Sequence, residues 1–245
     1  MALDIQRGET KGPDISEKGR SKEGGVLSSN VRLYMQLLAF GDCQQSQTDA
    51  VIAALDSAEI SATVYADISD PYGIAVLFWS TDPNFFVTEV RALLQDDAFA
   101  MLQPKPEMTM FGRSYSIGYE NDLQDVLVDR PARRVTDHDR PWAIWYPLRR
   151  SGAWEGVSAE EQRKMLMEHG GIGRAYGAAG HGTDIRLASY GLDTNDNDFV
   201  IALIGKDLTA LSKIVERMRK TKQTSQFITS LGPFFIGKVI WTAGQ

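Results

Sequence analysis

The segment KMLMEHGGIGRAYG, residues 164–177, places one histidine directly before three closely spaced glycines in a stretch of helical periodicity. The neighbours of His169 at three, four and seven residues along a helix include Met165, Ile172 and Tyr176, so the imidazole lies on the apolar face. Each glycine in a helix interior costs roughly 1 kcal/mol relative to alanine. Glycines kept at such positions indicate that something approaches the helix backbone closely.

Two interpretations of His169 follow from these residues. It is either a core histidine bonded to a carbonyl, or a single axial ligand to iron, with the glycines making room for a flat macrocycle. A lone histidine cannot build a zinc site, because zinc takes three or four ligands. Of the other two histidines, His138 lies in the polar stretch VTDHDR and is expected to be solvated. His181 precedes a predicted strand and is either a loop residue or a group on the second side of the site.

Arginine is concentrated in one segment of the chain. Residues 130–150 contain Arg130, Arg133, Arg134, Arg140, Arg149 and Arg150, although the net charge of the whole chain is −6. Guanidinium groups bind carboxylates and phosphates through two hydrogen bonds at once. The cluster is therefore either a carboxylate or phosphate site, or a solvated face that forms salt bridges.

Several other functions are disfavoured. There is no P-loop and no GxGxxG after a strand, so nucleotide binding has little support. The single cysteine, Cys43, excludes an internal disulfide framework and a multi-cysteine metal site. The acidic net charge argues against a general nucleic-acid binder. No apolar run reaches the ~18 residues of a membrane span, and no secretory core is present, so we expect a cytoplasmic protein.

The pattern of apolar residues predicts an internal repeat. Residues 1–30 are rich in Gly, Ser, Lys and Glu and are expected to form a disordered or extended tail. A first unit, residues 31–119, reads strand–helix–strand–strand–helix–strand, the order of a ferredoxin-like module. Its predicted elements are strands at 31–40, 60–68, 73–80 and 107–119 and helices at 48–59 and 82–94.

A second unit, residues 141–245, has the same order after a linker at 120–140. Its predicted strands are 141–150, 184–192, 198–205 and 232–241, and its helices are 158 to about 176 and 207–220. Ser158 and Glu161 form the capping-box pattern at the start of the first of these helices. The fold class is α+β, with two tandem ferredoxin-like modules whose sheets pack face to face or close into a barrel.

The joint order of WYPLRR, EHGGIGRAYG, GLD, MRKT and LGPFFIGK closely resembles the chlorite dismutase and coproheme decarboxylase family. The resemblance covers residues 142–241 and, more weakly, the N-terminal module. It implies a dimeric α+β barrel-type fold, with haem b or iron coproporphyrin III bound by the C-terminal module only, and the N-terminal module structural. It also implies a homo-oligomer, commonly a pentamer.

The resemblance assigns roles to individual residues. His169 corresponds to the proximal iron ligand, and Tyr146 to the tyrosine that relays a radical between peroxide-activated iron and a substrate propionate. The chlorite-degrading branch lacks that tyrosine. The other positions implied to lie against the cofactor are Arg130, Arg149, Arg219, Ser225 and Ile172.

Two positions depart from the family pattern. The distal residue, Arg in chlorite dismutases and Gln in many decarboxylases, corresponds here to Asp184, with Arg186 and His181 as alternatives. Gln223 stands where a glutamate usually orients the proximal imidazole, and a neutral partner would push less electron density onto the iron.

The leading functional prediction is an oxidoreductase of porphyrin biosynthesis that converts iron coproporphyrin III to haem b, with hydrogen peroxide as co-substrate. The second is decomposition of chlorite to chloride and dioxygen, which the lack of a clear distal arginine disfavours. The third is a haem-binding or haem-transfer protein without turnover.

Overall fold

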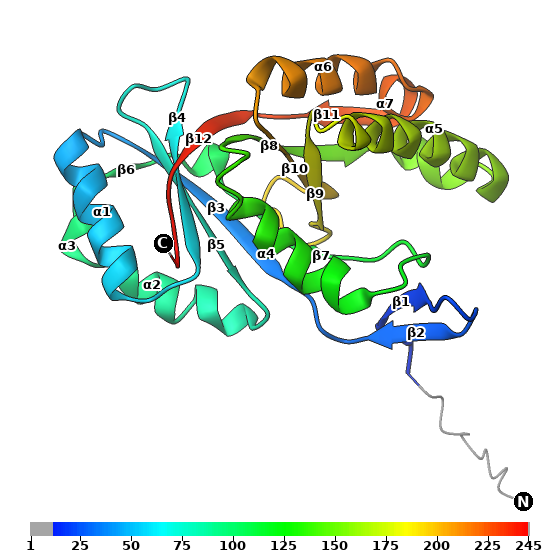
Figure 1. Cartoon of the computed structure of the whole chain (residues 1–245), viewed down its shortest axis with the longest axis horizontal. Coiled ribbons are helices and arrows are strands. Elements are labelled where there is room, and N and C mark those ends of the chain that lie inside the picture. Colours follow the sequence, from blue (N-terminus) through cyan, green and yellow to red (C-terminus); the bar gives the residue numbers. More distant parts are fainter. Residues whose placement is uncertain (1–11, 245) are drawn as a thin grey trace, which may run out of the picture.

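The computed structural model describes residues 12–244 (Figure 1). Residues 1–11 of the predicted tail lie outside this range. Within it, the chain forms a short N-terminal hairpin followed by one large antiparallel sheet with helices on its outer side. No helix among residues 12–244 has the length and apolar character needed to cross a membrane.

The N-terminal hairpin corrects the prediction of a disordered or extended tail. Strands β1 (Glu17–Arg20) and β2 (Val26–Ser29) pair antiparallel with each other. The Glu17 carboxylate holds the hairpin to the body of the protein, because it accepts bonds from Arg32 Nε at 2.9 Å, Arg113 Nη1 at 3.0 Å and the Ser116 amide at 2.9 Å. This anchor is made of polar groups far apart in the sequence, so hydrophobic periodicity could not predict it.

The first predicted module is present. Its strands are β3 (Tyr34–Gly41), β4 (Ala62–Asp67), β5 (Ile74–Ser80) and β7 (Met110–Ser114), and its α-helices are α1 (Gln45–Ser57), α2 (Glu89–Leu93) and α3 (Asp97–Ala100). A two-residue strand, β6 (Gln103–Pro104), pairs with β3. The helix predicted at 82–94 is divided into a 3-10 turn, Pro83–Phe86, and α2. Asp82, the first residue of the predicted helix, caps that turn by accepting a hydrogen bond from the Asn84 amide.

The second module follows the same plan. Its main elements are β8 (Trp142–Arg150), α5 (Ala159–Ala178), β9 (Thr183–Ala188), β10 (Phe199–Gly205), α6 (Leu208–Arg219) and β12 (Phe235–Thr242). A short helix, α7 (Lys222–Phe227), and strand β11 (Ile228–Leu231) are inserted before the last strand. The strand orders β7-β3-β5-β4 and β12-β8-β10-β9 are equivalent in the two modules, which confirms the repeat.

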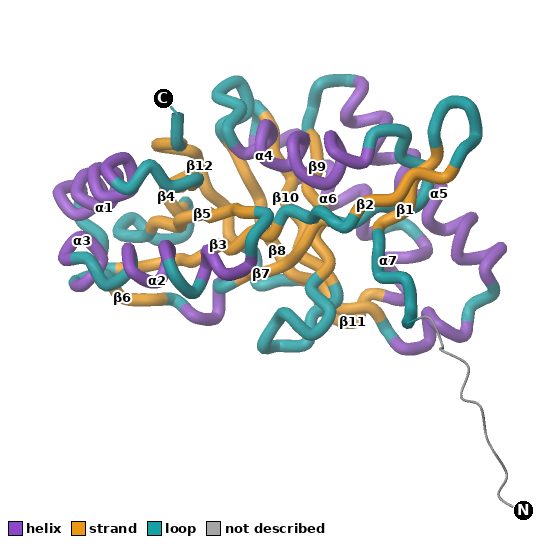
Figure 2. The backbone as a smooth tube through the Cα atoms, turned by 90° about the horizontal axis from the view of Figure 1, so that it is seen from below, coloured by secondary structure: helices purple, strands orange, loops and turns teal. Residues whose placement is uncertain are grey.

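The two modules close into one barrel within a single chain (Figure 2). The last strand of each module pairs with the second strand of the other, β7 with β9 and β12 with β4, and β8 pairs with β10 to complete the ring. Pairing across the modules leaves these strands without open edges, which would otherwise attract other chains. Of the two predicted arrangements, the barrel is therefore the correct one.

Alternate residues of each strand point into the barrel, where both modules contribute to one apolar core. Its largest fully buried members are Trp145, Tyr65, Phe235, Met35 and Leu37. Each such side chain contributes ~1.5–3 kcal/mol through burial. Helices α1, α2 and α3 cover the outer face of the N-terminal strands, and α5 and α6 lie over the C-terminal ones (Figure 1).

The segment predicted as a linker, residues 120–140, is a packed helical element. It contains a π-helical turn, Asp125–Asp129, that continues into helix α4 (Arg130–Val135). Leu127 and Val135 are buried, and the Leu127 carbonyl accepts a hydrogen bond from the Leu33 amide. Helix α4 is thus fixed beside the barrel.

Candidate functional site

The outer face of the C-terminal strands gathers most of the residues predicted for the site. In the register of β10, Ile201 lies opposite Tyr146 of β8 on one side and Arg186 of β9 on the other. Leu203, two residues along, lies opposite Asp184. Residues directly opposite in antiparallel strands point to the same face. Tyr146, Asp184 and Arg186 therefore share the face that α5 and α6 cover.

Helix α5 makes little contact with this face. Ser158 caps it by accepting a hydrogen bond from the Glu161 amide, as predicted. Only Met165 among its residues is buried, while Leu166, three residues before His169, is 48% exposed. His169, Ile172 and Tyr176 are half-buried on the side toward the sheet. Most of this 20-residue helix, including part of its apolar face, is therefore accessible to solvent or to a ligand.

The glycines after His169 are not explained by contact with another strand. Apart from the local helix backbone, a Cβ atom added to Gly171 would meet no atom of the described chain within 4 Å. At Gly173, one turn after the histidine, the nearest atom would be Met218 Cε at 3.8 Å, an ordinary van der Waals contact. At Gly170 it would be the flexible end of Arg174, at 3.7 Å. Within residues 12–244, the close approach that these glycines permit is therefore not made by protein atoms.

His169 is a poor match for a satisfied core histidine. Its Nδ1 atom is buried and has no hydrogen-bond partner among residues 12–244, and the same is true of the Gln223 amide oxygen. Burial lowers the pKa of His169, although the nearby Asp184 carboxylate acts in the opposite direction. The imidazole is therefore neutral at pH 7, which is the form that binds metal ions.

Helix α7 brings Gln223 to the same end of α5. The Glu168 carboxylate accepts a hydrogen bond from the Lys222 amide at 3.2 Å and so ties the two helices together directly beside both residues. The buried Nδ1 of His169 and the buried amide oxygen of Gln223 each lack a hydrogen-bond partner in the described chain. This is costly in free energy unless a small rearrangement or a bound ligand completes their hydrogen bonds.

Asp184 lies between two guanidinium groups. Its Oδ2 is 3.2 Å from Arg186 Nε, and its Oδ1 is 3.8 Å from Nη1 of Arg134, which also donates to the Asp184 main-chain oxygen. Arg134 comes from α4, and burial lowers its pKa. The sequence favoured Arg130 as the anchor from this segment, but Arg130 donates to Asp125 at 2.8 Å within its own helical segment. Arg134 lies four residues after Arg130, about one helical turn, and reaches β9. This i, i+4 spacing is visible in the sequence and could have indicated Arg134 as the alternative anchor.

Tyr146 and Arg219 meet at Phe234. The Tyr146 ring stacks on Phe234 with centroids 4.8 Å apart, and the Arg219 guanidinium lies 6.0 Å from the same ring. Tyr146 is only 8% exposed, and burial raises the pKa of its phenol, with Asp184 adding to the effect and Arg219 opposing it. The phenol is therefore protonated at pH 7.

Three predicted residues make contacts elsewhere. Arg149 donates to the main-chain oxygens of Asn195 and Asp196, so it is held at the acidic turn before β10. The Ser225 hydroxyl donates to the Thr221 carbonyl within α7 at 2.9 Å. The His181 ring lies 5.9 Å from that of Tyr176, at the end of α5. The roles of these side chains toward a cofactor stay predictions.

Two further residues border the site: Arg150, a member of the arginine cluster seen in the sequence, and Tyr115, which the sequence did not single out. The Arg150 guanidinium lies 4.9 Å from the Trp154 ring and 4.7 Å from the Phe199 ring, and its Nε is buried without a partner in the described chain. Tyr115 follows Ser114, which pairs with Leu187, and so stands beside Arg186. Burial raises the pKa of Tyr115, while Arg186 and Arg150 oppose the shift. The pairing of β7 with β9 brings Tyr115 here, and no local pattern signals it.

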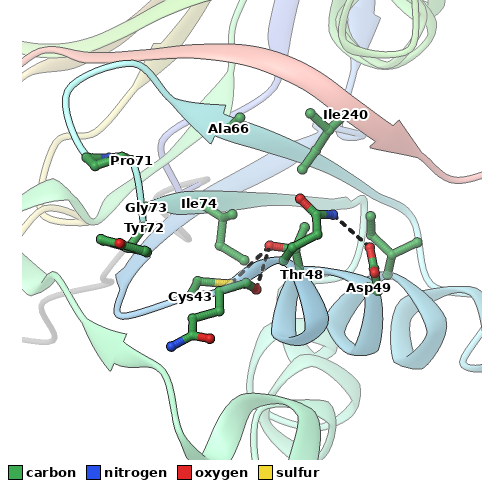
Figure 3. Close-up of a pocket in the computed structure, with 12 residues that line it drawn as sticks. Cys43, Thr48, Asp49, Ala66, Pro71, Tyr72, Gly73, Ile74 and Ile240 are labelled. Carbon is green, nitrogen blue, oxygen red and sulfur yellow. Dashed lines mark hydrogen bonds between the residues drawn. The ribbon is translucent and has the colours of Figure 1, made fainter.

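A separate cavity of about 710 Å³ lies in the N-terminal module (Figure 3). It is bounded by α1, the turn between β4 and β5, and Ile240 of β12, and the Cys43 thiol is hydrogen-bonded to Thr48 at its edge. The residues of the described chain that line it include no histidine and no arginine. In addition, no group of three or more His, Cys, Asp or Glu side chains within residues 12–244 is arranged to hold a metal ion.

Comparison with known proteins gives a consistent result. A family model described as Chlorite dismutase matches residues 119–240. A candidate heme-binding protein of Haloarcula marismortui is 26% identical over 204 residues, covering 78% of this chain and 30% of that protein. Coproheme decarboxylase of Staphylococcus carnosus is 34% identical over 87 residues, covering 36% of this chain and 33% of that protein. The chain thus spans about a third of the length of these relatives.

The fold is also found in solved structures. A variant of chlorite dismutase from Candidatus Nitrospira defluvii superimposes with a TM-score of 0.67 at 15% sequence identity. The match covers 86% of this chain and 92% of that chain, so both modules of the barrel take part.

Proposed function

Because the chain belongs to the chlorite dismutase and coproheme decarboxylase family through residues 119–240, we propose that it binds an iron porphyrin between α5 and the outer face of β8, β9 and β10. The observation that carries the proposal is His169, a neutral imidazole whose buried Nδ1 has no partner in the described part of the chain, on a helix whose glycines meet no close contact there. A porphyrin supplies four of the iron ligands itself, so one histidine is enough.

The residues present fit such a group. His169 would coordinate the iron, Gln223 would accept a hydrogen bond from its Nδ1–H, and Ile172 would line the same helix face. The carboxylates of the porphyrin would find Arg219 beside Tyr146, Arg134 on α4 and the partly unpaired Arg150. Arg130, Arg149 and Ser225 remain proposed anchors, which would have to leave their present partners to bind it.

The reaction we propose is the peroxide-dependent oxidative decarboxylation of iron coproporphyrin III to haem b. In each step one propionic acid side chain and one hydrogen peroxide give a vinyl group, carbon dioxide and two water molecules. The bound iron would supply the oxidising equivalents from peroxide. Tyr146 would pass them on by losing a proton and an electron and then regaining both at the substrate, since its phenol is buried and protonated.

The other residues would position and move protons. Arg219, next to the Tyr146–Phe234 stack, would hold the reacting carboxylate. Asp184 would take a proton from peroxide, and Arg186, 3.2 Å away, would stabilise the charge that results. Because Asp184 and Arg186 are about half-exposed, solvent screens their ion pair, which contributes less than a buried charge-assisted hydrogen bond would.

The test is to add iron coproporphyrin III and hydrogen peroxide to the purified protein and to follow product masses. Stepwise loss of carbon dioxide supports the decarboxylase. Chlorite consumption with release of dioxygen supports the alternative activity. An unchanged, bound porphyrin supports the third function, haem binding without turnover, which the paired Asp184 and the neutral Gln223 favour. Assembly into a pentamer stays a prediction.

A further inference from the structure

Asp184 introduces a negative charge among the arginines of the proposed site. Its carboxylate lies 3.2 Å from Arg186 Nε and 3.8 Å from Arg134 Nη1. The side chains of Asp184 and Arg186 are 47% and 46% exposed, whereas Arg134 is only 27% exposed. The aspartate thus occupies, between two guanidinium groups, a position that a carboxylate of a ligand could take.

The charge of Asp184 affects titratable side chains across the outer face of β8, β9 and β10. It acts electrostatically on the imidazole of His169, on the phenol of Tyr146 and on the phenol of Tyr115. These three side chains come from α5, β8 and the segment after β7, so a ligand that touches all of them cannot avoid the field of this carboxylate.

We propose that Asp184 sets the balance of affinity between four-carboxylate and two-carboxylate porphyrins, and that its charge weakens binding of the four-carboxylate substrate more than binding of the two-carboxylate product. The inference rests on the proposed porphyrin site. A ligand carboxylate competes with Asp184 for Arg134 and Arg186, and every further carboxylate adds a repulsion that a ligand with fewer carboxylates does not meet. Asp184 is therefore a specificity-determining residue of the site.

The size of the effect follows from Coulomb's law. Two like charges several ångströms apart near a protein surface repel each other measurably, but water and salt screen a half-exposed carboxylate. The affinity ratio between a four-carboxylate and a two-carboxylate porphyrin should therefore change by about tenfold at low ionic strength when the charge is removed, and by less at high salt.

The experiment compares iron coproporphyrin III with iron protoporphyrin IX, without peroxide. Each is titrated by Soret absorbance into the full-length wild-type protein and into Asp184→Asn, which keeps the side-chain volume and removes the charge. We expect Asp184→Asn to raise the ratio of coproporphyrin to protoporphyrin affinity about tenfold. Arg134→Gln should lower the same ratio, because it removes a cation from the site.

Asp49→Asn is the matched control. It makes the same change of charge on α1 of the N-terminal module, where the carboxylate accepts a hydrogen bond from Gln45. Its affinity ratio should equal that of the wild type. Circular dichroism establishes that each variant is folded, and Asp184→Gln serves as a second neutral variant if Asp184→Asn is not.

The two proposals fail in different ways. If no variant and no wild-type sample binds either porphyrin, the proposed function is wrong and the inference falls with it. If both porphyrins bind but the ratio is the same in wild type and Asp184→Asn, the porphyrin site stands and the role of Asp184 is refuted. An equal rise in Asp49→Asn also refutes it, because the effect would then be one of net charge.

Discussion

Replacing Gly173 with alanine should stabilise the ligand-free protein and weaken porphyrin binding. Gly173 lies one helical turn after His169, so both residues are on the same side of α5. The only described atom outside the local helix backbone within 4 Å of the added methyl is Met218 Cε, at 3.8 Å, and nothing has to move. The helix then gains up to about 1 kcal/mol in its free energy of unfolding from the better propensity of alanine.

The cost appears only when the ligand is bound. If the porphyrin lies against this face, the methyl group occupies space that the ligand needs, and overpacking of this kind costs about 1–3 kcal/mol. The affinity for iron protoporphyrin IX should therefore fall by about tenfold or more. Urea denaturation of the ligand-free protein and Soret titration measure the two effects separately.

Gly171→Ala provides the control. Its position is two residues before Gly173 and therefore on a different side of the helix, and no described atom outside the local helix backbone lies within 4 Å of its added Cβ. It should gain the same stability and keep wild-type affinity. The interpretation of the glycines is refuted if the two variants bind porphyrin equally well, or if Gly173→Ala destabilises the ligand-free protein.

Three further predictions concern single side chains. Tyr146→Phe should leave porphyrin affinity and stability within about 1 kcal/mol of wild type and abolish decarboxylation; product masses that match wild type would reduce Tyr146 to packing. His169→Ala should remove the Soret shift on haem addition while circular dichroism stays unchanged, and an unaltered spectrum would contradict its assignment as ligand. Burial alone would raise the pKa of Glu17, but its bonds to Ser116, Arg32 and Arg113 outweigh that and lower the pKa below the ordinary 4.5. Docking of the hairpin is therefore complete above pH 4.5 and is lost as the pH falls below that value, which hydrogen exchange at residues 17–29 would detect. Glu17→Gln should weaken docking already at pH 7. Equal protection of the hairpin in both proteins from pH 7 to pH 3 would show that Glu17 does not anchor it.

The sequence by itself determined the main strands and helices of the two modules, because these depend on local patterns. The period of apolar residues located the strands and helices, and Asp82 and Ser158 marked helical starts through their own side chains. His169 was identified in the same way, from its neighbours along one helix. Even so, α5 buries fewer residues than its apolar pattern suggested, since that pattern does not reveal what a helix packs against.

Only the tertiary structure decided which distant residues meet. The pairing of β7 with β9 and of β12 with β4 chose the barrel over two stacked sheets and brought Tyr115 beside Arg186. The position of α4 selected Arg134 to contact Asp184, while Arg130 binds Asp125 and Arg149 binds the acidic turn. A guanidinium group reaches any carboxylate or carbonyl that the fold brings near, and its own sequence neighbourhood does not say which. Contacts of this kind depend on strand pairing between segments far apart in the chain, so they are a property of the folded protein.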